Sequence, residues 1–403
     1  MKPWLAIVGI GEDGSAGLGP AARTLVETAE FLVGGARHLG MVPETNAAER
    51  LCWDHPLERT IDAIAAHRGQ RVTVLASGDP LWHGIGVTLL RRFPRAEMTI
   101  LPQPGAFSLA AARLGWPLAE CVTLSLHARP LDQLRLHLAP GRRILALSED
   151  GDTPRHVARL LNESGWGLSR LTVFAHMGGP RESVVAAAAE DWGEGRAADL
   201  NTIAIECRPG PGAKALPRLA GLPDDVFEHD GQLTKREIRA ATLAALAPLP
   251  GETLWDIGAG CGSIAIEWLR AAENGAAYAV ERDPDRAAAI ARNAAALGVP
   301  TLNVVLGAAP EVLAGLPPPD AVFVGGGISQ PGLLPAVWAG LRAGGRLVAN
   351  AVTVAGEAAL IDWQRRHGGD LTRIAVSRAM LAGRHLLWRP LAPITQLAVA
   401  KAA

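Results

Sequence analysis

The stretch LWDIGAGCGS at residues 254–263 decides the fold of the second half of the chain. Its apolar start is typical of a buried strand, and helical spacing begins at Ser263. Glycine is needed in such a turn where φ is positive or where the backbone touches a ligand, so Gly258, Gly260 and Gly262 are candidate cofactor contacts. Their alternate spacing differs from the GxGxxG turn that places a pyrophosphate at a helix N-terminus. The turn therefore indicates a ligand without a pyrophosphate.

Two carboxylates complete this candidate site. Glu281 ends the next predicted strand, nineteen residues after Gly262, where a carboxylate can accept hydrogen bonds from both hydroxyls of a ribose. Asp256, just before the turn, can meet a cationic amino group directly or through water. S-adenosylmethionine carries a ribose, an amino acid and a sulfonium but no phosphate, so we expect it to bind here. The alternative is an ordinary tight turn with a solvated carboxylate; the spacing of the two features favours the cofactor.

Strand and helix patterns alternate along the whole chain, which predicts an α/β protein. Regular units of about 30 residues in the second half predict a parallel, doubly wound sheet with its ligand at the carboxyl ends of the strands. The strands expected there are Thr253–Ile257, Tyr278–Val280, Asn303–Leu306, Ala321–Val324 and Arg346–Ala349. Two further runs, His385–Trp388 and Thr395–Ala400, are expected to pair as an antiparallel hairpin at the sheet edge.

The clearest break in the pattern is the proline- and glycine-rich segment between Arg208 and Asp225. We therefore expect a first domain over residues 1–207, a linker over 208–224 and a second domain over 225–403. In the first domain the strand-like runs are Leu5–Val8, Arg71–Ala76, Met98–Leu101, Ile144–Leu147, Leu171–Ala175 and Thr202–Cys207.

Composition limits the classes of partner. The 403 residues include 39 basic and 40 acidic ones, and a net charge of -1 gives no field that would attract nucleic acid or an anionic membrane. No apolar run approaches the roughly 20 residues that cross a bilayer, and the N-terminus lacks signal-peptide features. The four cysteines form no CxxC motif, so neither disulfides nor a metal site is indicated. We expect a cytoplasmic protein with no nucleic-acid or membrane partner.

The first half carries a second candidate cofactor site in two loops. SGDP at residues 77–80 follows a predicted strand directly, and QPGAFS at 103–108 ends the next one. Gly/Pro loops at neighbouring strand ends build a rigid crevice whose backbone groups can bind a ligand. Asp79, Pro104, Gly105 and Ala106 are the candidate contacts, and a simple turn is the alternative explanation.

Three segments of the first half resemble the tetrapyrrole methylase family, in particular its members that methylate a precorrin ring at C5. They are VGIGEDG at 8–14, LASGDPLWHGIG at 75–86 and QPGAFSLAAARLGWPL at 103–118, and the resemblance spans residues 4 to about 207. Glu12-Asp13-Gly14 stands where many relatives have Gly-Pro-Gly. This matches the C5-type subgroup and leaves open whether the first loop touches the substrate.

The second half resembles the decarboxylating precorrin methyltransferases of corrin biosynthesis over residues 228–400. The resemblance is carried by DGQLTKREIRA at 230–240, the glycine turn, AVERDPDRAAAIARNAAALGV at 279–299 and SRAMLAGRHLLW at 377–388. Where many adenosylmethionine enzymes place an acidic or polar residue toward the adenine, this chain has Ala308. The adenine contact would then come from backbone groups of Gly307, Ala308 and Ala309.

Together the two resemblances imply methylation of a reduced precorrin-6 at C5 and C15 with decarboxylation of a ring acetate, giving precorrin-8 in cobalamin biosynthesis. They imply one S-adenosylmethionine in each domain and no metal, and we expect a homo-oligomer. A methyltransferase for another tetrapyrrole and an adenosylmethionine-binding regulatory protein are the alternatives; the absence of GxGxxG argues against a nicotinamide dehydrogenase.

The substrate carries many carboxylates, so basic side chains should line its pocket. The candidates are Lys235, Arg239, Arg378 and Arg384, and the first two would share a helix face because they are four residues apart. No proton donor for the decarboxylation is assigned. His229 and His385 are considered for it, although a surface or core histidine is the default.

Overall fold

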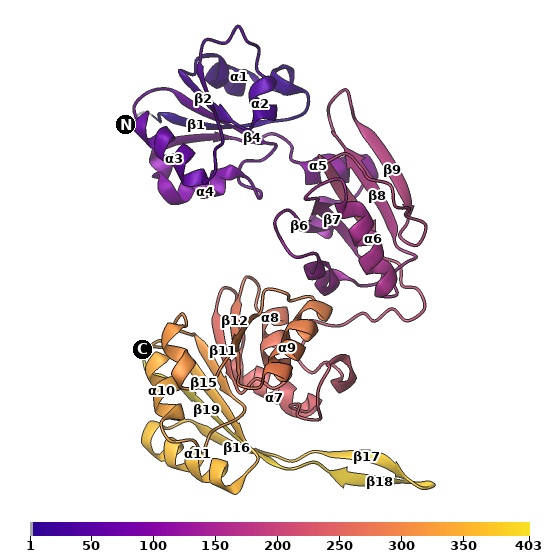
Figure 1. Cartoon of the computed structure of the whole chain (residues 1–403), viewed down its shortest axis with the longest axis vertical. Coiled ribbons are helices and arrows are strands. Elements are labelled where there is room, and N and C mark those ends of the chain that lie inside the picture. Colours follow the sequence, from indigo (N-terminus) through magenta and orange to yellow (C-terminus); the bar gives the residue numbers. More distant parts are fainter. Residues whose placement is uncertain (1–2) are drawn as a thin grey trace. The chain divides into compact units, whose positions relative to one another are not determined.

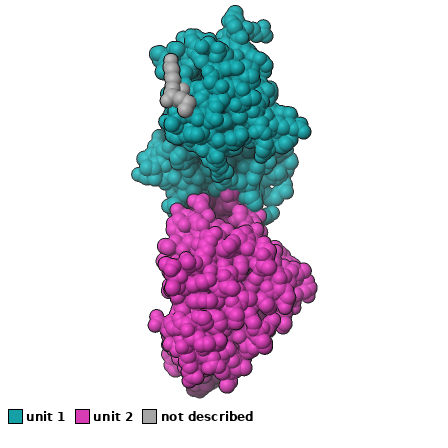
Figure 2. Space-filling view, turned by 90° about the vertical axis from the view of Figure 1, so that its left-hand side faces the viewer, with its two compact units in different colours: residues 1–131, 139–214 teal, residues 132–138, 215–403 magenta. Residues whose placement is uncertain are grey.

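The computed structural model describes residues 3–403 and divides the chain into two compact units (Figure 2). Unit 1 comprises the residues up to 131 and 139–214, and unit 2 comprises 132–138 and 215–403. Each unit contains a sheet with five neighbouring parallel strands and helices packed against it, which confirms the predicted α/β class.

The first sheet of unit 1 has five parallel strands in the order β3-β2-β4-β1-β5. They are β1 Leu5–Ile10, β2 Phe31–Gly34, β3 Glu49–Cys52, β4 Val72–Ser77 and β5 Met98–Leu101. Strand β1, which lies between β4 and β5, is buried along its whole length, as expected for a continuous apolar run covered on both faces. The accompanying helices are α1 Pro20–Glu27, α2 Ala36–Gly40, α3 Leu57–Ala66 and α4 Ile85–Arg92.

The second sheet of unit 1 is mixed, with the order β6-β7-β10-β8-β9. Its strands are β6 Val122–Ser125, β7 Arg143–Leu147, β8 Arg170–Ala175, β9 Ser183–Ala188 and β10 Asn201–Glu206. Helices α5 Ala106–Leu114 and α6 Thr153–Glu163 belong to this half of the unit (Figure 1). Phe107 of α5 packs with Leu145, Phe174 and Ala204 of the sheet, and this contact fixes the loop that precedes α5.

Unit 2 has a seven-stranded sheet in the order β13-β12-β11-β14-β15-β19-β16. Its strands are β11 Thr253–Ile257, β12 Ala276–Glu281, β13 Asn303–Leu306, β14 Ala321–Val324, β15 Arg346–Ala351, β16 Asp370–Ile374 and β19 Ile394–Ala400. The first five in the order are parallel, as predicted. The helices are α7 Arg236–Leu246, α8 Ser263–Ala271, α9 Pro284–Ala296, α10 Leu333–Gly340 and α11 Val354–His367. Alternate strand residues pack on opposite faces, for example Leu254 with one set of helices and Trp255 with the other.

The tail of unit 2 differs from the prediction. An antiparallel hairpin is present, but β18 His385–Pro390 pairs with β17 Ser377–Ala382 rather than with the last strand, so the predicted pairing is wrong. The last strand, β19, instead inserts antiparallel between β15 and β16. The physical reason is burial: β19 has mostly buried residues, whereas all six residues of β18 are exposed. Figure 1 shows β17 and β18 as a ribbon that projects from the sheet.

Unit 2 begins before the predicted domain start at Asp225. Residues 215–224 belong to it, and Leu222 is fully buried in its core. The backbone N–H groups of Gly221 and Leu222 donate to the two oxygens of Glu267 on α8 at 2.6 and 2.9 Å. The later part of the predicted linker is therefore tied to the second unit by buried hydrogen bonds.

Candidate functional site

The glycine turn of unit 2 connects β11 to α8 and packs against the loop after β14 and against α9. Gly258, Gly260 and Gly262 all have positive φ, at 69°, 61° and 80°. A Cβ on Gly258 would lie 3.0 Å from the backbone nitrogen of Gly326 in the loop after β14, and one on Gly262 would lie 2.8 Å from Ile290. The turn therefore needs glycine for its conformation and for the close approach of its neighbours.

Glu281 lies at the end of β12 and reaches back to this turn. One carboxylate oxygen accepts the N–H of Gly260 at 2.9 Å, and the other accepts those of Arg282 and Asp283 at 3.0 and 3.1 Å. The residue is 5% exposed. A carboxylate oxygen can accept two hydrogen bonds, so the oxygen that faces Gly260 keeps capacity for a ligand hydroxyl.

Asp256 is buried under the same turn with one oxygen unpartnered. Its Oδ2 accepts the N–H of Ala265 at 3.0 Å, while Oδ1 has no hydrogen-bond partner among residues 3–403. Burial raises the pKa of Asp256 to about 7, and the negative charge of Glu281 acts in the same direction. An orphaned buried acceptor of this kind could hold the ammonium group of S-adenosylmethionine, and Glu281 could hold its ribose.

The loop proposed to meet the adenine starts beside Glu281. The N–H of Gly307 donates to the backbone carbonyl of Glu281 at 2.9 Å, so Ala308 and Ala309 follow next to the end of β12. The carbonyl of Ala308 accepts the N–H of Val312, and that of Ala309 accepts the Gln330 side chain. The loop is thus fixed by backbone hydrogen bonds and by the Gln330 side chain.

Arg239 does not lie where a substrate could reach it. It is fully buried, and its guanidinium donates to Glu267 at 2.6 Å, to Asp224 at 3.1 Å and to the carbonyl of Leu222. The four-residue spacing predicted that Lys235 and Arg239 share a helix face. Lys235 is instead the N-cap residue of α7 and precedes its first turn. The expected substrate contact of Arg239 is therefore not supported, and the residue instead ties α7 to α8 and to the segment 215–224.

The other predicted basic and histidine residues lie in different places. Arg378 on β17 donates to Asp224 and Glu237, and Arg384 is exposed at the turn of the hairpin. Lys235 is half-buried and follows Gln232, whose carbonyl lies 3.6 Å from a Cβ built on Gly260. Lys235 therefore lies three residues after a residue that contacts the glycine turn. His229 caps its own turn by accepting the N–H of Gly231, and His385 is exposed on β18.

Unit 1 contains a cavity of about 570 Å³ that the two predicted loops line. Asp79, Pro104, Gly105 and Ala106 all border it. A Cβ on Gly78 would lie 2.6 Å from the Cα of Gly105, so the two loops touch. The Asp79 carboxylate accepts the N–H of Leu81 at 2.8 Å and thereby holds its own turn.

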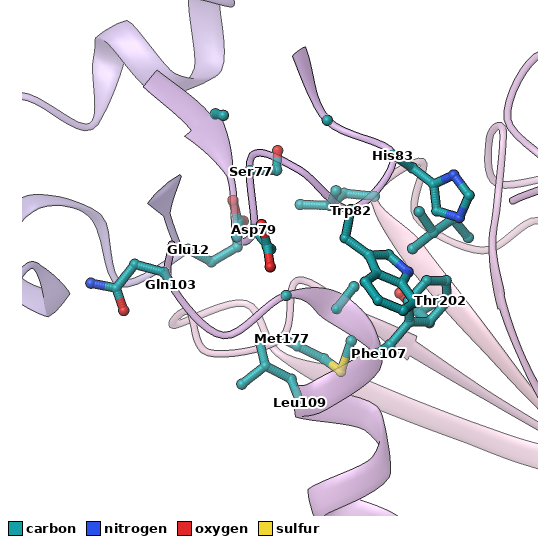
Figure 3. Close-up of a pocket in the computed structure, with 18 of the residues that line it drawn as sticks. Glu12, Ser77, Asp79, Trp82, His83, Gln103, Phe107, Leu109, Met177 and Thr202 are labelled. Carbon is teal, nitrogen blue, oxygen red and sulfur yellow. The ribbon is translucent and has the colours of Figure 1, made fainter. Parts of the chain in front are cut away.

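The cavity has an aromatic end and a polar end, as Figure 3 shows. Trp82 and Phe107 lie edge to face with ring centroids 6.5 Å apart, and Trp82 is 53% exposed. Glu12, Asp79 and Gln103 are at the polar end. The cavity therefore suits a ligand with one flat apolar part and one charged part.

A charged cluster at this cavity was not predicted from the sequence. The Glu12 carboxylate accepts from Arg37 through one oxygen and lies 3.0 Å from His176 Nδ1 through the other. Ser77 accepts from Arg37 at 2.8 Å and lies 2.9 Å from His38 Nε2. Burial raises the pKa of Glu12, but the hydrogen bond from His176 and the charge of Arg37 together outweigh it, so the pKa is lowered. The GIGEDG loop was the one available signal; nothing local marks Arg37 or His176.

Residues 3–403, which the structure describes, contain neither a metal-binding cluster nor a membrane-spanning helix. No group of three histidine, cysteine, aspartate or glutamate side chains could hold a metal ion there. No helix in the same range has the length and apolar character needed to span a bilayer.

The strand order of unit 2, its glycine turn with Glu281, and the loop-lined cavity of unit 1 define a methyltransferase with two different folds in one chain. Residues 225–401 match the family of the precorrin methyltransferase domain, and residues 5–192 match the tetrapyrrole (corrin/porphyrin) methylases.

Relatives of nearly full length carry both parts. A precorrin-6Y C(5,15)-methyltransferase (decarboxylating) of Sinorhizobium sp is 51% identical over 98% of this chain and 96% of its own. The protein of the same name from Mycobacterium tuberculosis (strain CDC 1551 / Oshkosh) is 42% identical over 98% of this chain and 100% of its own. The solved C-terminal domain of the Rhodobacter capsulatus precorrin-6Y C5,15-methyltransferase is 44% identical and covers 46% of this chain and 100% of that domain, with a TM-score of 0.44. The chain belongs to the family of decarboxylating precorrin-6Y C(5,15)-methyltransferases, which use S-adenosylmethionine.

Proposed function

We propose that the chain methylates a reduced precorrin-6 at C5 and C15 and removes one ring acetate as carbon dioxide, giving precorrin-8 in cobalamin biosynthesis. The observation that supports this is the presence of two separately built candidate cofactor sites in one chain, one in each unit. The names of the full-length relatives supply the substrate class. We propose one S-adenosylmethionine for each unit, no metal, and a cytoplasmic location.

Unit 1 is assigned to C5, and unit 2 to C15 and the decarboxylation. S-adenosylmethionine supplies the electrophilic methyl group in both reactions. In unit 2, Glu281 holds the ribose and Asp256 the ammonium, so the turn at 258–262 fixes the cofactor between two buried carboxylates. In unit 1, the loops with Asp79 and Pro104-Gly105-Ala106 hold the cofactor against the cavity wall and exclude water.

The substrate carboxylates are proposed to bind Lys235 first. It is half-buried and close in sequence to the segment that covers the glycine turn, and no ion pair of its side chain is found among residues 3–403. Arg378 already pairs with two carboxylates, and Arg384 reaches the site only if the hairpin turn contacts the substrate. Arg378 and Arg384 are secondary candidates for the same role, and burial excludes Arg239.

The β17–β18 hairpin supports the proposal of a homo-oligomer. It exposes Leu381, Leu386 and Trp388 by 74%, 70% and 75%. A two-stranded ribbon is marginally stable alone, and exposed apolar side chains gathered on one element mark an interaction surface. We propose that the hairpin of a second copy of this chain covers them.

The test of the function is to inactivate each site separately and identify the products by mass spectrometry. Asp79→Ala should abolish most of the C5 methylation and leave C15 methylation and carbon dioxide release intact. Asp79→Asn keeps an acceptor for Leu81 and serves as the control for the turn. A regulatory protein would consume no precorrin, and equal loss of both reactions in Asp79→Ala would contradict the assignment of the units.

A further inference from the structure

Four histidines line the cavity of unit 1: His38, His83, His127 and His176. Among residues 3–403, His176 is the one of these four with a ring nitrogen within hydrogen-bond distance of a carboxylate. Because a carboxylate can only accept, Nδ1 is the ring nitrogen that donates to Glu12, and in the neutral ring Nε2 then carries the free electron pair. This is the arrangement in which histidine acts as a base.

Methylation of a ring CH requires such a base. The new bond joins the substrate carbon to the methyl carbon, and the carbon–sulfur bond breaks with its electron pair on sulfur. The hydrogen of the substrate carbon then leaves as a proton, and its bonding pair restores the double bond. Atoms and charges balance only when a group takes up this proton.

We propose that His176 accepts the proton released at C5 and that Glu12 is its positioning residue. The inference rests on the proposed C5 methylation in unit 1. His176 lines the same cavity as Asp79 and the 104–106 loop, so it lies in the compartment where the methyl group is transferred. The negative charge of Glu12 stabilises the imidazolium that forms.

The backbone around His176 is built to hold this side chain. Its φ is 50°, a conformation that costs energy for a residue other than glycine and collects at functional sites. The carbonyl of His176 accepts the N–H of Gly179 at 3.1 Å, and a Cβ on Gly179 would lie 2.7 Å from that of Glu12. The turn after β8 is thus pressed against the loop after β1, which sets the distance between base and carboxylate.

The other histidines of the cavity fit the role less well. Burial and the adjacent charge of Arg37 lower the pKa of His38 to about 4, so His38 is too weak a base to hold a proton near neutral pH. Burial likewise lowers the pKa of His83, with a further contribution from Arg129. His127 is exposed and no carboxylate among the described residues pairs with its ring.

The charges around the pair come from α2 and from the segment after β8. Arg37 on α2 pairs with Glu12, and Arg181, after β8, lies 3.9 Å from the same carboxylate. Arg181 also lies 3.5 Å from His176 Nδ1. These cations oppose the charge on His176, so the carboxylate of Glu12 is required, and neutralising it should slow the reaction.

The test uses the whole chain and follows the C5 and C15 products in one reaction. His176→Asn keeps a residue that tolerates positive φ but has no base, so kcat for C5 methylation should fall by about a hundredfold or more, while C15 methylation stays unchanged. Added imidazole should restore the C5 rate in proportion to its concentration and have no effect on the unmodified chain. His156→Asn, an exposed histidine on α6, is the matched control and should behave as the unmodified chain.

Glu12→Gln should lower the C5 rate by about tenfold, and combining it with His176→Asn should add little, because both changes remove one function. A C5 rate in His176→Asn within threefold of the unmodified chain would overturn the proposal. So would a loss that imidazole does not restore, because this would mean that the Glu12–His176 pair only holds the two loops together. If the unmodified chain makes no C5 product, the proposed function fails instead.

Discussion

Burial of Asp256 makes the folded state of unit 2 sensitive to pH. The folded chain keeps the proton up to about pH 7, whereas the unfolded chain releases it near the ordinary value of 3.8. The folded state therefore binds more protons between these two values, so this residue makes the free energy of unfolding fall as pH rises from about 4 to about 7. Denaturant titrations should show a flatter pH dependence in Asp256→Asn. An identical slope in both proteins would mean that Asp256 is ionised in the folded state throughout.

The same residue should make cofactor binding depend on pH with the opposite sign. An ammonium group favours the ionised carboxylate, so the affinity of unit 2 for S-adenosylmethionine should rise by up to about tenfold per pH unit from about 5.5 to 7 and then level off. Calorimetric titration at several pH values measures this, with Asp256→Asn as the variant that should bind weakly and without the trend. Equal affinity at pH 5.5 and pH 7 would place the ammonium elsewhere.

Glu281 gives the sharpest binding test at the residue scale. Charge-assisted hydrogen bonds to a ribose are worth on the order of 1.5–3 kcal/mol, so Glu281→Ala should weaken binding in unit 2 by about ten- to a hundredfold. Because both oxygens of Glu281 also accept backbone N–H groups, Glu281→Gln must turn its amino group toward a donor and should lose part of the affinity as well. In calorimetry the tight sites per chain should drop from two to one. Two unchanged sites in a variant whose thermal melt shows it folded would remove the ribose contact.

At the scale of the elements, the start of unit 2 can be tested with two fragments. A fragment over 215–403 keeps Leu222 and Asp224, whereas one over 225–403 loses both and leaves Arg239 and Glu267 with fewer partners. Deleting a buried leucine alone costs about 2–5 kcal/mol, so the shorter fragment should melt roughly 5–15 °C lower. Equal melting temperatures would show that residues 215–224 add nothing to the stability of this unit.

The exposed hairpin predicts the assembly state. Replacing Leu386 and Trp388 by serine should convert the oligomer to a monomer in analytical ultracentrifugation, because the apolar contact area is lost. Val354→Ser is the matched control, since Val354 is 87% exposed and belongs to α11 rather than to the hairpin. A monomeric unmodified chain, or an oligomer that survives both hairpin changes, would contradict the proposal.

Short sequence patterns predict where strands, helices and loops lie, but they do not predict which strands pair or which distant side chains meet. The strands around the glycine turn and the loops at 77–80 and 103–108 follow from short runs of sequence, and the structure places them at strand ends as expected. The pairing of the tail strands depends on which strand is buried, and a local pattern does not show this. Arg239 looked like a surface cation because its partners, Glu267 and Asp224, are distant in sequence. Glu12 and His176, 164 residues apart, were missed for the same reason.

On the scale of the whole molecule, the central claim is that one chain performs both methylations. Two units with unrelated sheets match two families, and relatives of nearly full length share the combination. Because both units belong to one chain, the two active sites are always present in equal numbers.

The most direct test is mass spectrometry of the product after the whole chain has reacted with the reduced precorrin and S-adenosylmethionine. The account predicts a product that has gained two methyl groups and lost one carbon dioxide, with two S-adenosylhomocysteine molecules formed for each. A product that has gained a single methyl group, from a chain whose units are both folded, would contradict it.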